Sequence, residues 1–268
     1  MIAINMIGGG FQHEVCSTAH NVPKHIVWDK SRHEAAISVH IDEGIFQLPV
    51  DATKTNVALF SESPYFTRRL QEYLLDTDLG REHAKKFKYI LSFDKAFLKK
   101  HPEAKYVVPT ACPWVKDRQI FPKTKTVSII ASSKREAPGH QLRHMVIETY
   151  KGHLDVFGGG YNPIPEKSMG LNDYMFSFAI ENIQADGYFS EKIADCFATG
   201  TVPIYWGDTT ISDYFLEEGI VRINDDFDIL TLTKDLYMSK LPAVKENYRR
   251  VIEFPCSEDY MYLTYLRD

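Results

Sequence analysis

Short apolar runs alternate with helical runs of about ten residues along most of this chain, and this alternation limits its fold more than any other feature. The apolar runs at 126–131 and 174–180 each precede a run with helical periodicity, at 138–150 and 191–198. Strands that alternate with helices in this way form βαβ units, which build parallel sheets with helices on both faces. The sequence therefore predicts an α/β fold.

The same pattern divides the chain into two halves. Further strands are expected at 2–7, 36–41, 57–60, 89–93, 106–108, 154–157, 201–205 and 220–223, and further helices at 66–75, 95–100, 212–218 and within 241–266. Residues 110–126 follow neither period and contain Pro113 and Pro122, so we expect a linker there. We predict a Rossmann-like domain over 1–122 and a second over 123–268, with the last helices able to fold back onto the first domain.

Charge, cysteine content and hydropathy argue against a nucleic-acid-binding, zinc-binding, secreted or membrane-spanning protein. A net charge of -5 and a pI near 6.1 argue against non-specific binding to nucleic acid, which needs a positive field. The four cysteines lack the spacing of a zinc site and are interpreted as reduced, buried thiols. The N-terminus lacks the basic region of a signal peptide, and no stretch approaches the roughly 18 apolar residues of a transmembrane helix. We therefore expect a cytoplasmic protein without a transmembrane segment.

A helix start in the second half carries the most informative charges. Ser190 is a plausible N-cap, which places Glu191 and Lys192 in the first helical turn. A lysine opposes the helix dipole at this end unless an anion binds there, and a helix N-terminus with a lysine describes a phosphate site. A neighbouring carboxylate suits the hydroxyl groups of a ribose, so the pair suggests a nucleoside diphosphate. A solvated Glu–Lys pair of little energetic weight explains these two residues equally well.

The surrounding motif resembles that of a known family. Residues 174–207 read YMFSFAIENIQADGYFSEKIADCFATGTVPIYWG. This stretch is similar to the signature of the glycosyltransferase family 10 α-1,3-fucosyltransferases, which has an F-x-x-E-N strand end, a Y-x-[ST]-E-K helix start and a G-T-x-P-x-Y-W-G segment. Weaker similarity covers most of residues 126–235.

The resemblance implies a GT-B fold, in which two Rossmann-like domains with parallel sheets face a central cleft and the second domain holds GDP-fucose. It implies that Glu191 binds the ribose, that Lys192 and Arg143 bind the diphosphate, and that Tyr188 lies along the nucleotide. Asn182 of the strand-end motif is expected to bind substrate as well. Arg135 remains a competitor for the diphosphate role. The resemblance implies no obligatory metal, and nothing in the sequence supports a nicotinamide or flavin cofactor.

An inverting transfer also needs a base that takes the proton of the acceptor hydroxyl. The family offers a glutamate after a strand of the first domain, often in an E-S-P context, and Glu62 precedes Ser63 and Pro64 here. Glu62 is therefore the predicted catalytic base. A helix cap or a solvated loop acid is the alternative interpretation of so short a motif.

We accordingly expect an inverting, fucosyltransferase-like hexosyltransferase that takes GDP-fucose and a glycan acceptor. A transferase for another nucleotide sugar and a catalytically silent binding protein for nucleotide sugar or glycan are the alternatives. Seven lysines between Lys85 and Lys105 allow peripheral contact with an anionic membrane, although the interrupting acids Asp94 and Glu103 favour a solvated helical face.

Overall fold

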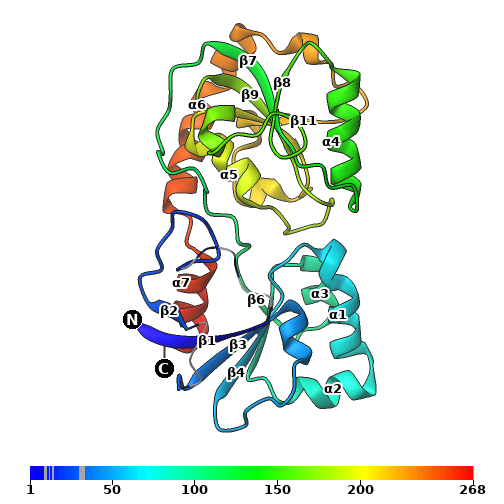
Figure 1. Cartoon of the computed structure of the whole chain (residues 1–268), viewed down its shortest axis with the longest axis vertical. Helices are drawn as coiled ribbons and strands as arrows, with labels where there is room; N and C mark the ends of the chain where they lie inside the picture. Colours follow the sequence, from blue (N-terminus) through cyan, green and yellow to red (C-terminus); the bar gives the residue numbers. More distant parts are fainter. Residues whose placement is uncertain (9–10, 12, 14, 30–33, 268) are drawn as a thin grey trace. The chain divides into compact units, whose positions relative to one another are not determined.

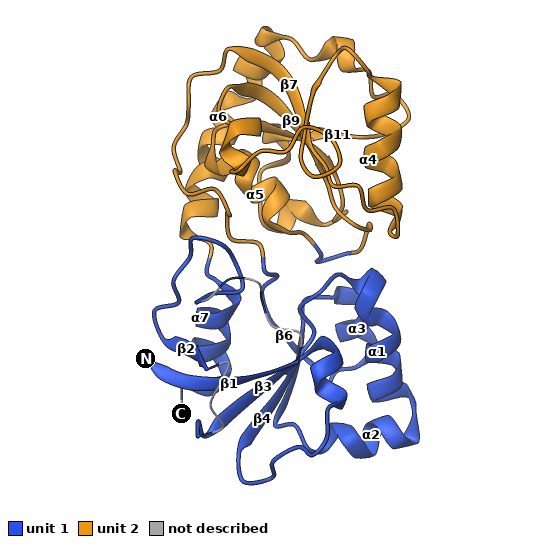
Figure 2. Cartoon of the chain, in the orientation of Figure 1, with its two compact units in different colours: residues 1–110, 186–188, 255–268 blue, residues 111–185, 189–254 orange. Residues whose placement is uncertain are grey.

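A computed structural model describes residues 1–8, 11, 13, 15–29 and 34–267 of the chain. The chain forms two compact units, shown in Figure 2. Unit 1 comprises residues 1–110, 186–188 and 255–268, and unit 2 comprises residues 111–185 and 189–254. Each unit is built on one sheet whose strands all pair in parallel, which confirms the predicted α/β fold.

Unit 1 contains a six-stranded sheet in the order β2-β1-β3-β4-β5-β6. Its strands are β1 Ile2–Gly8, β2 Ile26–Asp29, β3 Ile37–Ile41, β4 Thr55–Leu59, β5 Tyr89–Ser92 and β6 Lys105–Tyr106, and its helices are α1 Pro64–Asp76, α2 Asp78–Ala84, α3 Lys95–Lys100 and α7 Ser257–Met261. Alternate side chains of the central strands supply two apolar layers. Val57 and Leu59 pack with Met261 of α7, whereas Ala58 packs with Leu74 of α1 and Phe97 of α3. Figure 1 shows these helices on opposite sides of the sheet.

Unit 2 contains a five-stranded sheet in the order β11-β10-β9-β7-β8. Its strands are β7 Lys125–Ile130, β8 Asp155–Phe157, β9 Tyr174–Ile180, β10 Val202–Trp206 and β11 Val221–Arg222, and its long helices are α4 Pro138–Thr149, α5 Glu191–Ala198 and α6 Lys234–Glu253. Strand β9 lies at the centre and is buried along almost all of its length, as expected for a parallel strand covered on both faces. Helices α4 and α6 lie on opposite sides of this sheet (Figure 1). No helix of the described residues is long and apolar enough to cross a bilayer.

Two predicted elements differ from the structure in instructive ways. The predicted helix at 212–218 is wrong, because only the short 3-10 turns Ile211–Asp213 and Glu217–Gly219 form there. The buried amide of Asn247 in α6 accepts a hydrogen bond from the Leu216 N–H at 2.7 Å and donates one to the Leu216 carbonyl at 2.9 Å. A tertiary partner therefore takes the backbone groups that a helix would have used.

The expected linker belongs to the core of unit 2. The two units divide between residues 110 and 111, earlier than the predicted boundary at 122. Ala111 and Val115 are buried in the unit 2 core, and Asp195 of α5 accepts hydrogen bonds from the backbone N–H groups of Trp114 and Val115, at 2.6 and 3.0 Å. The segment shows neither helical nor strand periodicity because contacts with side chains of unit 2, and not regular secondary structure, fix its conformation.

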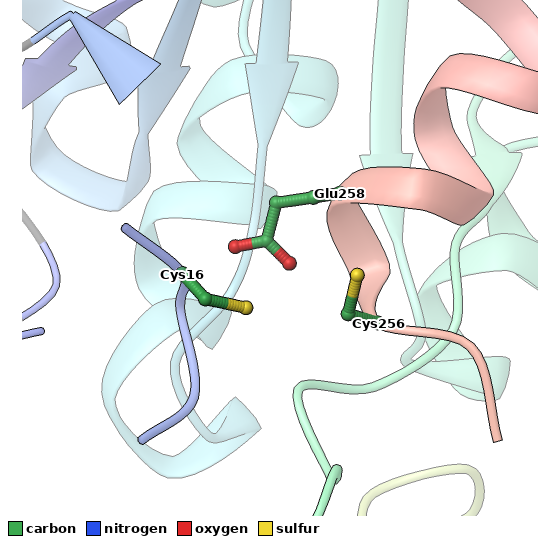
Figure 3. A group of neighbouring side chains, drawn as sticks. All are labelled: Cys16, Cys256 and Glu258. Carbon is green, nitrogen blue, oxygen red and sulfur yellow. The ribbon is translucent and has the colours of Figure 1, made fainter. Parts of the chain in front are cut away.

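Helix α7 is fixed within unit 1 by a buried carboxylate. Glu258 accepts hydrogen bonds from the Ser17 N–H, from Trp28 Nε1 at 3.1 Å and from the hydroxyls of Ser17 and Ser257, at 3.0 and 3.3 Å. The thiols of Cys16 and Cys256 point toward it in Figure 3, and the ligand atoms of the three residues lie within 4.8 Å of one another. All four cysteines are buried free thiols, as predicted. The four donors account for the buried Glu258 as a structural residue that ties α7 to the first residues of the chain.

Glu258→Ala is expected to lower the free energy of unfolding by at least about 2 kcal/mol. The substitution leaves two buried N–H donors, on Ser17 and Trp28, without an acceptor, at about 1–3 kcal/mol each. Denaturant unfolding followed by tryptophan fluorescence measures the effect. Glu258→Gln keeps an oxygen acceptor and is the control that should lose less. Equal stability of the alanine variant and the wild type would contradict this role of the carboxylate.

Candidate active site

Polar side chains gather at the carboxyl edge of the unit 2 sheet, where ligands of open α/β sheets usually bind. Strand β9 ends at Ile180, and the chain continues through Glu181 and Asn182 to the start of α5. The Ser190 hydroxyl caps α5 by accepting a hydrogen bond from the Lys192 N–H at 3.5 Å, as the sequence predicted. Glu191 and Lys192 therefore occupy the first turn of the helix.

A cavity of about 250 Å³ opens at this edge, within unit 2. Its polar lining includes three cations and two carboxylates: Arg143, Lys167, Lys192, Glu191 and Asp195. Gly158 also lines it and has a φ of +108°, and a Cβ at this position would lie 2.1 Å from the Ala131 carbonyl oxygen. Only glycine fits there, so the turn after β8 can pass close to the end of β7 and leave the cavity open.

Close packing of α4 against β9 positions Arg143. A Cβ on Gly139 would lie 1.7 Å from the Glu181 carbonyl oxygen, so glycine is required at the start of α4. One turn later, Arg143 Nε donates to the Ile180 carbonyl at 3.0 Å and Nη2 donates to Asn182 Oδ1 at 3.0 Å. Arg143 is buried, with 6% of its surface exposed. The structure thus brings Arg143 and Asn182 together.

Lys192 contacts a buried carboxylate that we did not predict to act at the site. Its Nζ donates to Ser190 Oγ at 2.9 Å and to Glu181 Oε2 at 3.4 Å. Glu181 is fully buried and also accepts hydrogen bonds from the Ser190 N–H and hydroxyl, at 2.9 and 2.7 Å. The F-x-x-E-N motif named this glutamate, and its position after a buried strand was the available signal.

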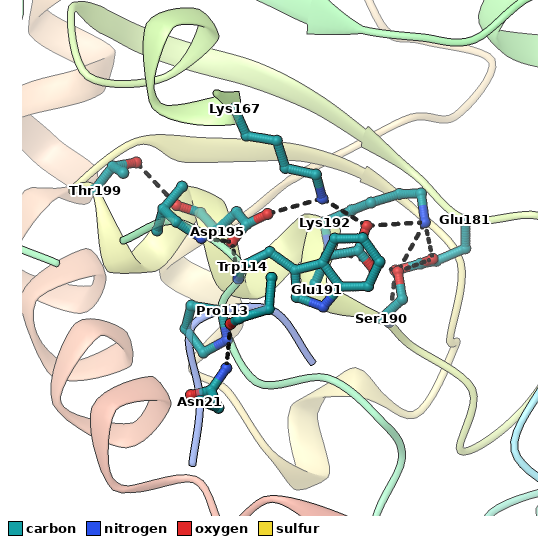
Figure 4. A network of polar contacts seen from close by, with 12 residues as sticks. Asn21, Pro113, Trp114, Lys167, Glu181, Ser190, Glu191, Lys192, Asp195 and Thr199 are labelled. Carbon is teal, nitrogen blue, oxygen red and sulfur yellow. Dashed lines mark hydrogen bonds and ion pairs between the residues drawn. The ribbon is translucent and has the colours of Figure 1, made fainter. Parts of the chain in front are cut away.

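Lys167 is a second cation that sequence reasoning missed. Its Nζ donates to Glu191 Oε1 at 2.7 Å and to Asp195 Oδ2 at 3.0 Å, and it lies 4.5 Å from the centroid of the Trp114 ring. Figure 4 shows the ammonium group between the two carboxylates, which lie one turn apart on α5. The sequence offers little signal for this contact, since Lys167 lies in a short 3-10 helix, Lys167–Gly170, far from α5 in the chain.

The electrostatics of this group favour the charged forms of Lys167 and Glu191. Burial opposes ionisation of Glu191, but the charges of Lys167 and Lys192 outweigh it and hold the pKa of Glu191 well below its usual range. Burial likewise disfavours a charged Lys167, but Asp195 and Glu191 hold its pKa above the ordinary value. Burial raises the pKa of Asp195 against the charge of Lys167. Glu191 therefore offers a carboxylate whose ionised form is favoured at the wall of the cavity.

Glu62 lies in unit 1, where β4 leads into α1. Its side chain is exposed, and its Oε1 accepts a hydrogen bond from the Ser63 N–H at 2.8 Å. The loop is held by Asp42, whose Oδ1 accepts from the N–H groups of Ser61 and Glu62 at 2.9 and 3.4 Å. Burial raises the pKa of Asp42 to about 6 despite these hydrogen bonds. Asp42 was not predicted, and its left-handed φ of 50° is unusual outside glycine.

Asp42→Asn is expected to make the protein more stable relative to the wild type as the pH rises from about 3 to about 7, because the pKa of Asp42 differs between the unfolded and folded states over this interval. Because the pKa of the folded state exceeds the ordinary value of 3.8, the wild type is stabilised by protonation of Asp42 and loses this stability as the pH rises through about 6. Asparagine tolerates the same backbone conformation and keeps an oxygen acceptor. The relative gain should reach up to about 3 kcal/mol, at about 1.4 kcal/mol per pKa unit. Thermal unfolding across this pH range measures it, and a pH-independent difference would contradict the role of Asp42.

Three of the predicted residues do not line the cavity. The described residues that line it do not include Tyr188, Asn182 or Arg135. Tyr188 belongs to unit 1 and stacks on Phe93, with ring centroids 5.8 Å apart and planes inclined by 28°. The side chain of Arg135 is exposed.

A sequence profile described as "Glycosyltransferase family 10 (fucosyltransferase) C-term" matches residues 120–260, more than half of the chain. The chain belongs to glycosyltransferase family 10. This family segment contains every residue that lines the unit 2 cavity, so the site described above lies in the part of the chain that defines the family.

Two curated relatives have fucosyltransferase names. The chain is 31% identical over 124 residues, 44% of its length, to the alpha-(1,3)-fucosyltransferase FucT of Helicobacter pylori. It is 31% identical over 87 residues, 31% of its length, to a putative fucosyltransferase of Acanthamoeba polyphaga mimivirus. These matches span only 25% and 14% of the relatives' own lengths.

A solved structure supports the fold class. A mutant of TarM from S. aureus, in complex with fondaparinux, alpha-GlcNAc-glycerol and UDP, aligns with a TM-score of 0.51 at 14% identity. The alignment covers 86% of this chain and 55% of that protein. This similarity confirms the predicted GT-B fold class.

Proposed function

We propose that the cavity of unit 2 binds GDP-fucose and that this family 10 protein transfers fucose to a hydroxyl group of a glycan acceptor, with inversion at the anomeric carbon. The observation that carries the proposal is the cavity itself. Cations and a carboxylate held in its ionised form line it beside the N-terminus of α5, within the segment that matches the family.

The charges suit the parts of a nucleoside diphosphate. We assign the diphosphate to Lys192 and Arg143, together with the N–H groups at the start of α5, because these groups combine positive charge with directed donors. We assign the ribose hydroxyls to Glu191, whose carboxylate stays ionised and accepts hydrogen bonds. Asn182, which orients the Arg143 guanidinium, and Tyr188 complete the proposed donor site.

The proposed reaction is a single displacement. The acceptor oxygen forms a bond to the anomeric carbon of fucose while the bond from that carbon to the β-phosphate oxygen of GDP breaks. The carboxylate of Glu62 takes the proton of the acceptor hydroxyl, and the cations of unit 2 stabilise the negative charge that develops on the departing GDP. The proposal involves no metal ion and no organic cofactor.

A screen of acceptor sugars with labelled GDP-fucose tests this function. We expect labelled fucose on at least one class of glycan and slow release of free fucose when acceptor is omitted. Tight GDP binding without transfer to any acceptor and without release of fucose would instead identify a silent binding protein. Transfer from another nucleotide sugar in preference to GDP-fucose would contradict the donor assignment.

A further inference from the structure

Lys167 and Lys192 both contact the Glu191 carboxylate, but their nearest partners differ. Lys167 binds Glu191 and Asp195, whereas Lys192 lies nearest to the Ser190 hydroxyl and Glu181 (Figure 4). The two lysines nevertheless compete for one atom. Glu191 Oε1 lies 2.7 Å from Lys167 Nζ and 3.7 Å from Lys192 Nζ. Lys167 is therefore the closer partner of the Glu191 carboxylate, and Lys192 lies closer to Glu181 than to Glu191.

Because Glu191 and Asp195 are buried, the loss of Lys167 would affect both carboxylates strongly. The side chain of Glu191 is only 12% exposed and that of Asp195 only 2%, so bulk solvent compensates poorly for a lost cation at either carboxylate. Without Lys167, the nearest cation to Glu191 in the described structure is Lys192, on the same helix turn. Glu191 would then turn toward Lys192 and engage the group that we assign to the diphosphate.

We infer that Lys167 is a positioning residue for nucleotide recognition: by binding Glu191 and Asp195 together, it directs the Glu191 carboxylate to the ribose hydroxyls and leaves Lys192 for the diphosphate. This inference rests on the proposed function. It gives Lys167 a measurable role, since the preference for a nucleotide with ribose hydroxyls over one without them depends on the direction and charge of Glu191.

The pH dependence of that preference follows from the charges around Glu191. Lys167 approaches it from the 3-10 helix, Lys192 and Asp195 flank it on α5, Glu181 lies beyond Lys192, and Arg143 of α4 lines the same cavity. Loss of Lys167 removes the strongest charge that favours ionisation, while burial and Asp195 continue to oppose it. The pKa of Glu191 then rises, and protonation at acid pH removes the acceptor for the ribose.

The experiment compares GDP with 2′,3′-dideoxy-GDP by titration calorimetry from about pH 5.5 to about pH 7.5. Both nucleotides carry the same diphosphate, so the ratio of their affinities cancels titration of the phosphates. In the wild type we expect a preference for GDP of about tenfold or more that varies little with pH. In Lys167→Met we expect this preference to fall severalfold, most strongly at the acid end. Lys167→Arg, which keeps the charge, should restore most of it.

Matched variants separate positioning from a general effect on folding. Lys125 has analogous contacts in the same unit, 3.8 Å from Asp155 and 5.1 Å from the Tyr174 ring centroid, but does not line the cavity. Lys125→Met should keep the wild-type preference. If Lys167→Met fails to fold because Asp195 is left unpaired, Lys167→Met combined with Asp195→Asn removes that charge and is titrated instead.

Each result decides the inference. An unchanged preference at every pH in a folded Lys167 variant would overturn it and leave Lys167 with a purely structural role. A wild type that binds GDP but does not prefer it to the dideoxy nucleotide would overturn the assignment of Glu191 to the ribose and this inference with it. A wild type that binds neither nucleotide would overturn the proposed function itself.

Discussion

Glu62→Gln is expected to lower fucose transfer by about 10²–10⁴-fold while GDP binding stays unchanged. Glutamine keeps the size of the side chain and one oxygen but cannot accept the proton of the acceptor hydroxyl, and a general base contributes rate enhancements of this order. The loop should keep its conformation in this variant. Its backbone N–H groups at Ser61 and Glu62 donate to the carboxylate of Asp42, which the substitution does not change. Transfer of labelled fucose at saturating GDP-fucose measures the change.

Glu72→Gln is the matched control for this substitution. Glu72 is an exposed glutamate on α1, the helix that follows Glu62, and its replacement should leave transfer at the wild-type rate. Transfer by the Glu62 variant at a rate within a few-fold of the wild type would remove Glu62 as the base. The exposed cap or loop acid would then be the correct interpretation of the E-S-P context.

Lys192→Ala and Arg143→Ala are each expected to weaken GDP binding by about 1.5–3 kcal/mol, the contribution of a hydrogen bond to a charged group. Calorimetry with GDP measures the loss, and circular dichroism establishes that each variant is folded. Arg143 is the more demanding case, because its guanidinium also binds the Ile180 carbonyl and Asn182. Arg143→Lys retains the charge and distinguishes loss of the cation from loss of these contacts.

Arg135→Ala is the control that addresses the remaining alternative for the diphosphate. Arg135 is exposed and does not line the cavity, so its replacement should leave the affinity for GDP unchanged. A larger loss of affinity in the Arg135 variant than in the Arg143 variant would transfer the role to Arg135. Unchanged affinity in folded Lys192 and Arg143 variants would refute the proposed donor site.

Local sequence signals predicted several elements closely, including the strand and the helix that carry the unit 2 site. The strand at Tyr174–Ile180 and the helices at Lys95–Lys100 and Glu191–Ala198 form with the predicted bounds. Each has a boundary that the chain itself defines: an apolar run fills the central strand, Asp94 and Ser190 cap the two helices, and Pro102 follows the first of them. Where capping residues and periodicity agree, they define the bounds of an element without help from tertiary contacts.

Tertiary contacts explain what the sequence could not predict. Strand β2 was missed because four residues, IVWD, carry too short a pattern to stand out. The predicted helix at 212–218 is absent because Asn247, some thirty residues later, binds its backbone. Helix α2 was also missed, although Thr77 caps it by accepting a hydrogen bond from the Gly80 N–H at 3.0 Å.

In the candidate site, too, local features could be predicted and tertiary contacts could not. The first turn of α5 was readable because its residues are adjacent in the sequence and fit a known motif. The contact of Lys167 with Glu191 and Asp195 joins segments 24 and 28 residues apart, and no periodicity relates a 3-10 helix to α5 across that distance. Burial of Arg143 could not be predicted for a similar reason, since the close approach that Gly139 allows is a property of the packed α4 and β9.

Titration calorimetry of the whole protein with GDP, UDP and ADP tests most directly whether unit 2 holds a guanosine diphosphate sugar through Lys192, Arg143 and Glu191. We predict that GDP binds more tightly than either UDP or ADP and that Lys192→Ala weakens this binding. Preference for UDP or ADP, or GDP binding that the Lys192 substitution leaves intact, would contradict this assignment.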